Sequence, residues 1–186
     1  MTSVGRAAAV IFFFAAVVAA APFASGTRFG MVGFDYRASS GRIYSYPPDS
    51  ECVRADPFFR LGLGIAPKLA LGADLALFNS IPKHGDVFLN TPVFAFGPVV
   101  TFFPSPVGKV QTYATAGGAI TYKFYFAYQA WRFRLSSGAL LDVGLPVSLG
   151  AEIGWYADVE RCPAPRPFWL TGSSFYLGLR LSDLRV

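Results

Sequence analysis

The sequence predicts an all-β fold, an eight-stranded antiparallel up-and-down β-barrel that spans a membrane. Three observations predict it: an apolar run of the export-signal type near the N-terminus, segments in which apolar and polar residues alternate with a period of two, and connections that alternate between long and short. At 186 residues, the chain has the length of one domain.

The N-terminal run predicts export. A short positively charged start precedes Ala7–Ala21 (AAAVIFFFAAVVAAA), an apolar run of fifteen residues that ends in alanines. A membrane-spanning helix needs about 20 residues, whereas a run of this length is typical of a secretory signal peptide. We therefore expect residues 1–25 to be a cleaved signal, with cleavage between Ala20 and Gly26, and residues 26–186 to be the barrel. A retained anchor helix is the alternative.

Eight segments after this run carry the strand pattern. In the closing segment (SSFYLGLRLSDLRV), Phe175, Leu177 and Leu179 alternate with Tyr176 and Gly178, as in a strand with one apolar face. The expected strands are Arg28–Arg37, Phe58–Ala66, Leu69–Asn79, Thr91–Phe102, Val110–Phe124, Trp131–Gly144, Ser148–Val159 and Ser173–Ser182.

The connections between these segments alternate in length. Ala38–Pro57, Ser80–Asn90 and Cys162–Gly172 are long, whereas Pro67–Lys68 and Leu145–Val147 are short. This rhythm is typical of an outer-membrane barrel with its long loops outside the cell. An even number of strands places both chain ends on the periplasmic side.

The polar face of the strands combines glycine with charge. A soluble barrel would carry charges outside and large apolar residues inside, whereas an Arg or Lys facing lipid at mid-membrane costs about 2–4 kcal/mol. We therefore expect the charged face to line the lumen and the leucines to face lipid. Eleven charges fall on it, six basic and five acidic: Asp35, Arg37, Arg60, Asp74, Lys123, Arg132, Arg134, Asp142, Glu152, Asp158 and Arg180.

Seven of these residues are predicted to form a lumen charge network: Asp35, Arg60, Asp74, Arg132, Arg134, Glu152 and Arg180. Arg28, at the start of its strand, is expected at the membrane edge, where a long side chain reaches the headgroups. Aromatic residues gather near the strand ends, which is typical of the girdles of membrane barrels. The expected girdle residues are Phe102, Phe103, Tyr122 to Tyr128, Trp131, Trp155, Tyr156, Phe168 and Trp169.

The signal run, the eight alternating segments and the closing FYLGLRL together resemble the small outer-membrane β-barrel proteins, the class that holds the OmpA transmembrane domain and OmpX. The resemblance is one of pattern and covers nearly all of the chain after the signal. It implies an integral protein of the bacterial outer membrane with lipid around it. Such proteins usually end on an aromatic residue, whereas this chain ends in SDLRV.

The two cysteines, Cys52 and Cys162, fall in the expected loops after the first and the seventh strands. Closure of the barrel brings these loops together, and export favours oxidation. We therefore predict a Cys52–Cys162 disulfide at the extracellular rim, with two free thiols as the alternative. Two distant cysteines and one histidine lack the spacing of a metal site.

Catalytic chemistry has little support in the sequence. His84, the only histidine, sits in a loop (IPKHGDV) with no serine placed beside it. The strand carboxylates could form an acid–base pair, but each has potential Arg or Lys partners, and an eight-stranded barrel has an interior that side chains fill. Neither GLGIAPKLALG nor ATAGGAITY matches a nucleotide-binding loop. The net charge of +5 is spread along the chain, which disfavours nucleic acid.

We therefore expect a monomeric outer-membrane barrel that is not an enzyme, has no cofactor, and plays a structural or surface-interaction role. The first long loop, with Tyr44, Tyr46 and Pro47, could contact surface ligands. Three alternatives remain: a lipid-modifying outer-membrane enzyme that uses His84, a small porin-like pore, and a soluble, lipocalin-like, ligand-binding barrel.

Overall fold

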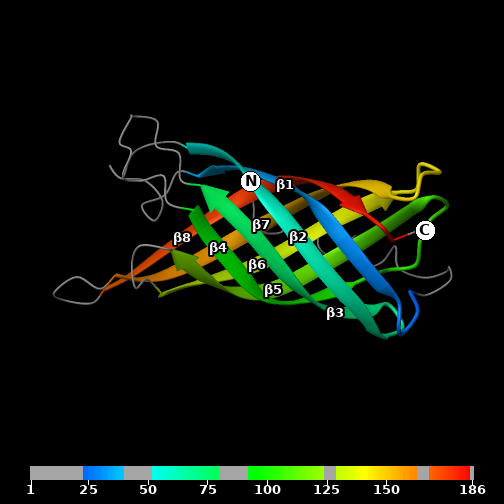
Figure 1. Ribbon diagram of the computed structural model, residues 1–186, viewed down its shortest axis with the longest axis horizontal. Helices are drawn as coiled ribbons and strands as arrows, with labels where there is room; N and C mark the ends of the chain where they lie inside the picture. Colours follow the sequence, from blue (N-terminus) through cyan, green and yellow to red (C-terminus); the bar gives the residue numbers. More distant parts are fainter. Residues whose placement is uncertain (1–22, 40–51, 80–91, 124–128, 163–167, 185–186) are drawn as a thin grey trace, which may run out of the picture.

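The computed structural model describes residues 23–39, 52–79, 92–123, 129–162 and 168–184. These residues form eight β-strands that run in sequence order around the molecule (Figure 1). The strands are β1 (Arg28–Ser39), β2 (Cys52–Ala66), β3 (Leu69–Asn79), β4 (Pro92–Phe102), β5 (Val110–Lys123), β6 (Gln129–Leu141), β7 (Ser148–Cys162) and β8 (Phe168–Ser182).

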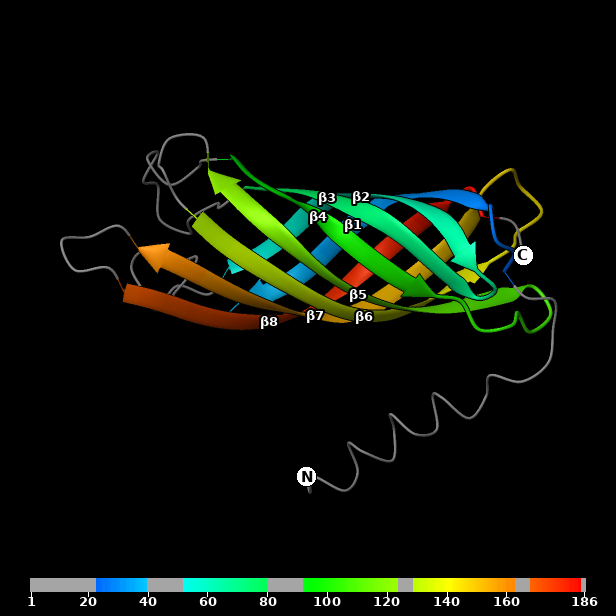
Figure 2. The ribbon, with the colours of Figure 1, turned by 90° about the horizontal axis from the view of Figure 1, so that it is seen from below.

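Each strand pairs antiparallel with its neighbours in the sequence, and β1 pairs with β8, so the sheet closes into a barrel. At this closing seam Phe34 lies opposite Leu179 and Gly33 lies opposite Arg180. The strands cross the long axis of the barrel obliquely in both views (Figure 1 and Figure 2), as closure of a small barrel requires. The predicted fold, an eight-stranded antiparallel up-and-down barrel, is confirmed.

No helix among the described residues is long and apolar enough to cross a membrane.

Most strand bounds agree with the sequence pattern, and two differ clearly. β3 has the predicted bounds, whereas β2 begins at Cys52 and β8 at Phe168, each several residues earlier than expected. In β2 the early start includes Pro57, which lies opposite Phe34 of β1. The ladder with β3 begins only at Phe58, so a proline there disrupts no pairing on that side.

The two ends of the barrel differ in their connections. We call the end where β1 begins and β8 finishes the terminal end; it lies at the right of Figure 1 and carries the connections 67–68, 103–109 and 142–147. We call the opposite end the loop end. There, the strands end on either side of residues 40–51, 80–91, 124–128 and 163–167, which lie outside the described part of the chain.

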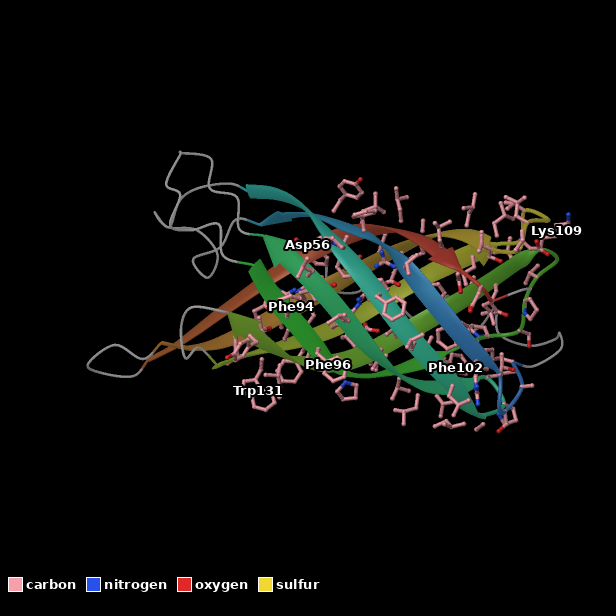
Figure 3. The ribbon with its side chains drawn as sticks, viewed as in Figure 1. Asp56, Phe94, Phe96, Phe102, Lys109 and Trp131 are labelled. Atoms are coloured by element: carbon pink, nitrogen blue, oxygen red, sulfur yellow. The ribbon has the colours of Figure 1, made fainter. Side chains whose placement is uncertain are left out.

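Large apolar side chains cover the outside of all eight strands. Leu61 of β2 is 55% exposed and Phe175 of β8 is 78% exposed, and Phe96 and Trp131 point away from the wall (Figure 3). Of the charged strand side chains that the structure describes, only Arg28, the first residue of β1, is exposed. The faces are therefore arranged as the alternation predicts, with Leu177 and Leu179 outside and Arg180 inside.

Glycine inside the barrel makes room for long side chains. A Cβ at Gly154 would collide with the ring of Tyr176, and a Cβ at Gly178 would collide with the guanidinium of Arg180. These glycines allow the long side chains to lie across the narrow lumen.

Candidate functional site

The interior of the barrel holds the charged residues that the sequence placed on the polar face. Six of the seven predicted network residues are buried, and Asp74 is nearly so, with its side chain 13% exposed. They come from six strands and point into the lumen. Asp35 lies on β1, Arg60 on β2, Asp74 on β3, Arg132 and Arg134 on β6, Glu152 on β7 and Arg180 on β8.

Asp158 is also buried, but Asp142 departs from the prediction. β6 ends at Leu141, so Asp142 lies in the turn that follows, where its carboxylate accepts a hydrogen bond of 2.8 Å from the backbone N–H of Gly144. The side chains of Arg37 and Lys123 lie outside the described residues.

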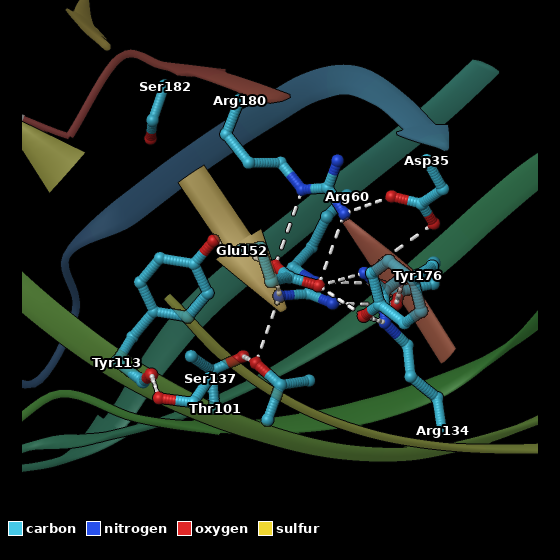
Figure 4. Close-up of polar contacts among 12 residues, drawn as sticks. Asp35, Arg60, Thr101, Tyr113, Arg134, Ser137, Glu152, Tyr176, Arg180 and Ser182 are labelled. Carbon is cyan, nitrogen blue, oxygen red and sulfur yellow. Dashed lines mark hydrogen bonds and ion pairs between the residues drawn. The ribbon is translucent and has the colours of Figure 1, made fainter. Parts of the chain in front are cut away.

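Glu152 is the centre of the network (Figure 4). Its carboxylate accepts hydrogen bonds from Arg134 Nη2 and from Arg180, at 3.1 Å to Nη2 and 3.3 Å to Nε. Arg60 Nη1 lies 3.9 Å away as an ion-pair partner. Glu152 is 1% exposed, so these contacts offset the cost of removing its charge from water.

Two tyrosines complete the surroundings of Glu152. The hydroxyl of Tyr113 on β5 donates to Glu152 Oε2 at 2.7 Å, and the hydroxyl of Tyr176 on β8 donates to Oε1 at 2.5 Å. Tyr176 also accepts from Arg134 Nε at 2.7 Å. The carboxylate is therefore held by groups from β2, β5, β6 and β8.

Asp74 and Asp35 extend the network around the wall. Arg60 makes a two-pronged contact with Asp74, at 2.6 Å from Nε and 2.8 Å from Nη2, and Arg134 Nη1 lies 3.2 Å from the same carboxylate. Asp35 accepts from Arg180 Nη2 and, at 2.5 Å, from the hydroxyl of Tyr156.

A second ion pair joins β6 and β7. Arg132 donates to Asp158 at 2.6 Å from Nε and 3.2 Å from Nη2. Its guanidinium also lies over the ring of Tyr156, 4.6 Å from the centroid. Paired hydrogen bonds of this kind fix the direction of the arginine as well as neutralising it.

Phe58 separates the charged part of the lumen from an apolar part. The guanidiniums of Arg134 and Arg180 each lie 4.4 Å from its ring centroid, and that of Arg60 lies 5.0 Å away. The same ring belongs to a buried apolar cluster, which we call the terminal cluster: Phe23, Phe29, Met31, Phe58, Ala70, Phe103, Tyr113, Leu140 and Leu184.

The terminal cluster corrects the girdle prediction for Phe103, which is fully buried rather than at the lipid boundary. Tyr156 is likewise buried and belongs to the charge network. The reason is position: a ring near the end of a strand faces either lipid or lumen, and at these two positions it faces the lumen. Tyr122 and Trp131 are exposed, as predicted for girdle residues.

A cavity of about 20 Å³ lies beside the network, a volume that holds about one water molecule. On one side it is bounded by small residues of β3, β4 and β5 and on the other by Arg132, Arg134 and Tyr156. The small lining residues are Ala76, Ala95, Gly97, Pro98, Gly117, Gly118 and Ala119, with Asp74 beside them.

The remaining predicted sites fall largely outside the described residues. His84, Tyr44, Tyr46 and Pro47 are not described, nor are the side chains of the two cysteines. In the backbone, Cys52 begins β2 and Cys162 ends β7, rather than lying in loops, and β1 and β8 separate these strands. The disulfide stays a prediction. Among the described residues, no group of three or more His, Cys, Asp or Glu side chains is arranged to hold a metal ion.

Sequence reasoning missed Tyr113, Phe58 and Asp56 as interior residues, all of which are buried. The signal was available in the alternation. Phe58 and Asp56 share the parity of Arg60 on β2, and Tyr113 shares the parity of Thr115 on β5. Their inward direction follows from that parity once the strand bounds are known.

No protein-family model matches the chain, and no curated protein matches it in sequence. Among solved structures, it is similar to the crystal structure of Neisserial surface protein A (NspA), with 13% identity and a TM-score of 0.60 over 83% of this chain and 95% of that one. A solid-state NMR structure of outer membrane protein AlkL in DMPC lipid bilayers matches with 11% identity and a TM-score of 0.48, over 91% of this chain and 95% of that one. The likeness to NspA confirms that the chain has the fold of the small outer-membrane β-barrels.

Proposed function

We propose that the protein is an integral barrel of the bacterial outer membrane with a structural or surface-interaction role, a filled lumen and no catalytic site. The observation that carries this proposal is the inversion of the two faces. Large apolar side chains are exposed around the whole outside, while arginines and carboxylates are buried inside.

The outer face supports a lipid environment. Monomeric soluble proteins rarely expose a contiguous apolar patch larger than a few hundred Å², whereas here exposed apolar residues follow one another along every strand, as Leu61, Leu63 and Ile65 do on β2. Hydrocarbon around the barrel removes the cost of that exposure. A soluble lipocalin-like barrel would need the opposite arrangement, with apolar residues lining a pocket.

The interior supports a structural role rather than a pore or an enzyme. Phe103, Met31 and Leu140 are fully buried in the terminal cluster, where they fill one end of the lumen. Glu152, the most central carboxylate, is held by arginines and tyrosines, which leaves it poorly suited to exchange protons with a substrate. The lipid-modifying alternative depends on His84, and nothing among the described residues favours it.

The first experiment is heat modifiability. The protein, refolded in detergent and run on a gel without boiling, should migrate faster than its boiled form, because a closed barrel resists detergent until it is heated. A chain that remains soluble and monomeric without detergent would overturn the membrane assignment.

Conductance tests the filled lumen. Inserted into planar bilayers, the protein should show no steady ion current, because the buried apolar side chains of the terminal cluster fill one end of the lumen. Reproducible single-channel steps would favour the pore instead.

A further inference from the structure

The segment that precedes β1 is part of the folded barrel. Phe23 is only 8% exposed. Its ring stacks on that of Phe103 with centroids 4.4 Å apart and meets the ring of Phe29 edge-on at 6.0 Å. Phe23 is thus a member of the terminal cluster, although it lies before the first strand.

The backbone holds this segment in place as well. The N–H of Lys68, in the turn between β2 and β3, donates to the carbonyl of Phe23 at 2.9 Å, and the N–H of Phe103 donates to the carbonyl of Lys68 at 2.8 Å. Lys68 has a φ of 66°, a left-handed conformation that few lysines adopt. The carbonyl of Phe23 therefore accepts the hydrogen bond of a backbone N–H in a strained turn.

Gly64 of β2 pairs through its backbone with the same segment, Phe23–Thr27. Its N–H donates to the carbonyl of Thr27 at 2.8 Å, and its carbonyl accepts from the N–H of Gly26 at the same distance. A Cβ at Gly64 would collide with the carbonyl oxygen of Ala24 and with the ring of Phe23. Glycine at this position makes room for the segment Phe23–Thr27.

We infer that the export signal is cleaved on the N-terminal side of Phe23, so that Phe23 remains in the mature protein and seals the terminal end of the lumen. The inference rests on the proposed export. Cleavage after Ala24 would remove the buried ring and the carbonyl that Lys68 requires. The inferred cut thus lies upstream of the Ser25–Gly26 bond, where the sequence pattern places the end of the signal peptide.

The sequence supplies a suitable bond. Ala19, Ala20 and Ala21 give the small-residue pattern at which signal peptides are cut. A membrane-bound signal peptidase would hydrolyse the amide after Ala20 or Ala21: water adds across the C–N bond, the signal leaves with a carboxylate, and the barrel begins with a free amine. The mature chain would thus start just before Phe23.

The intact mass of the protein tests this cut. The full-length chain is expressed in a Gram-negative host, and the outer-membrane fraction is analysed by mass spectrometry. A mass that corresponds to a start at Ala21 or Pro22 supports the inference. A start after Phe23, or an uncut chain in that fraction, overturns it while leaving the membrane assignment standing. An uncut chain that never reaches the outer membrane overturns both.

Point variants of the full-length chain test the seal. Phe23→Ala should lower the temperature at which the folded gel band is lost by roughly 10 °C, because it opens a hole among packed rings. Phe23→Leu should recover most of the loss. Ser25→Ala, at an exposed position of the same segment, is the matched control and should leave the temperature unchanged. Equal behaviour of Phe23→Ala and Ser25→Ala overturns the sealing role.

Discussion

The lumen has two regions built by different means. At the terminal end, rings such as Phe29 and Phe103 pack against each other in a cluster of apolar and aromatic side chains. Farther toward the loop end, Glu152, Arg134 and Arg180 fill the same narrow space by pairing charge. Both regions bury their side chains almost completely.

Because of this difference, the two regions should respond differently to substitutions. The terminal cluster depends on shape and on the exclusion of charge, so any unpaired charge there is costly. The charge network depends on balance. The charged side chains that the structure describes inside the barrel are five acids and four arginines, so their charges nearly cancel, and removal of one partner leaves the opposite charge buried and unpaired. The acids are Asp35, Asp56, Asp74, Glu152 and Asp158, and the arginines are Arg60, Arg132, Arg134 and Arg180.

The largest effect should come from a charge placed in the wrong region. Ala70 and Ala76 are both buried on β3 and both face the lumen, but Ala70 belongs to the terminal cluster and Ala76 lines the cavity beside Arg132 and Arg134. Ala70→Asp should cost at least about 5 kcal/mol of the free energy of unfolding, enough to prevent refolding.

Ala76→Asp should lower the free energy of unfolding by only about 1 kcal/mol, because Arg132 and Arg134 line the same cavity and can pair with the new carboxylate. Urea unfolding in detergent, followed by tryptophan fluorescence, measures the stability of Ala76→Asp, and the heat-modifiable gel band shows whether Ala70→Asp refolds at all. If the two aspartates cost the same, the division of the lumen into two regions is wrong.

The next effect concerns the centre of the network. Glu152→Gln keeps the shape of the side chain but leaves Arg134 and Arg180 without their shared carboxylate. It should lower the free energy of unfolding by about 3–5 kcal/mol. Asp142→Asn, in the turn after β6, is the control and should change it by less than about 0.5 kcal/mol. A Glu152→Gln protein as stable as the parent would show that the network contributes specificity rather than stability.

A smaller effect is expected on the outside. Leu177→Arg places a charge on the outer face near the middle of β8, where lipid would surround it, and should cost about 2–4 kcal/mol in lipid vesicles. Val143→Arg, an exposed change in the turn after β6, should be close to neutral. The same small cost at both positions would argue against a lipid-facing belt at Leu177.

The smallest effect links the two regions. Tyr113 belongs to the terminal cluster by its ring and to the network by its hydroxyl, which donates to Glu152. Tyr113→Phe removes only the hydroxyl and should cost about 1–2 kcal/mol, since a hydrogen bond to a charged group is lost. Tyr36→Phe, at an exposed position on β1, should cost nothing measurable. A null result at Tyr113 would mean that the network needs no support from the terminal cluster.

Alternation of residue types was enough to predict the fold and the direction of most strand residues. Leu177 and Arg180 fall on the predicted faces. In a strand every second residue points to the same side, so once the charged residues are assigned to the lumen, the direction of every other residue in the strand is fixed. The start of β2 could not be predicted, because Pro57 is a strand breaker in the sequence, and only the one-sided pairing with β1 makes it tolerable there.

The contacts within the lumen were beyond prediction for a geometric reason. Arg60 and Asp74 lie opposite each other on neighbouring strands, a pairing that register alone could indicate. Arg134, by contrast, reaches Glu152 on the next strand and Asp74 across the lumen. Contacts across the lumen depend on the total stagger of the strands around the closed barrel, and the residue pattern of a single strand does not determine that stagger.

The convergence of β2, β5, β6 and β8 on Glu152 has a consequence for the order of assembly. None of these partners is near Glu152 in an open sheet except those on the adjacent strands β6 and β8. A half-closed sheet in lipid would hold arginines and carboxylates without their full set of counter-charges, which the hydrocarbon disfavours strongly. We therefore expect closure and burial in the bilayer to advance together, with a cooperative, all-or-none insertion step as the kinetic signature of this arrangement.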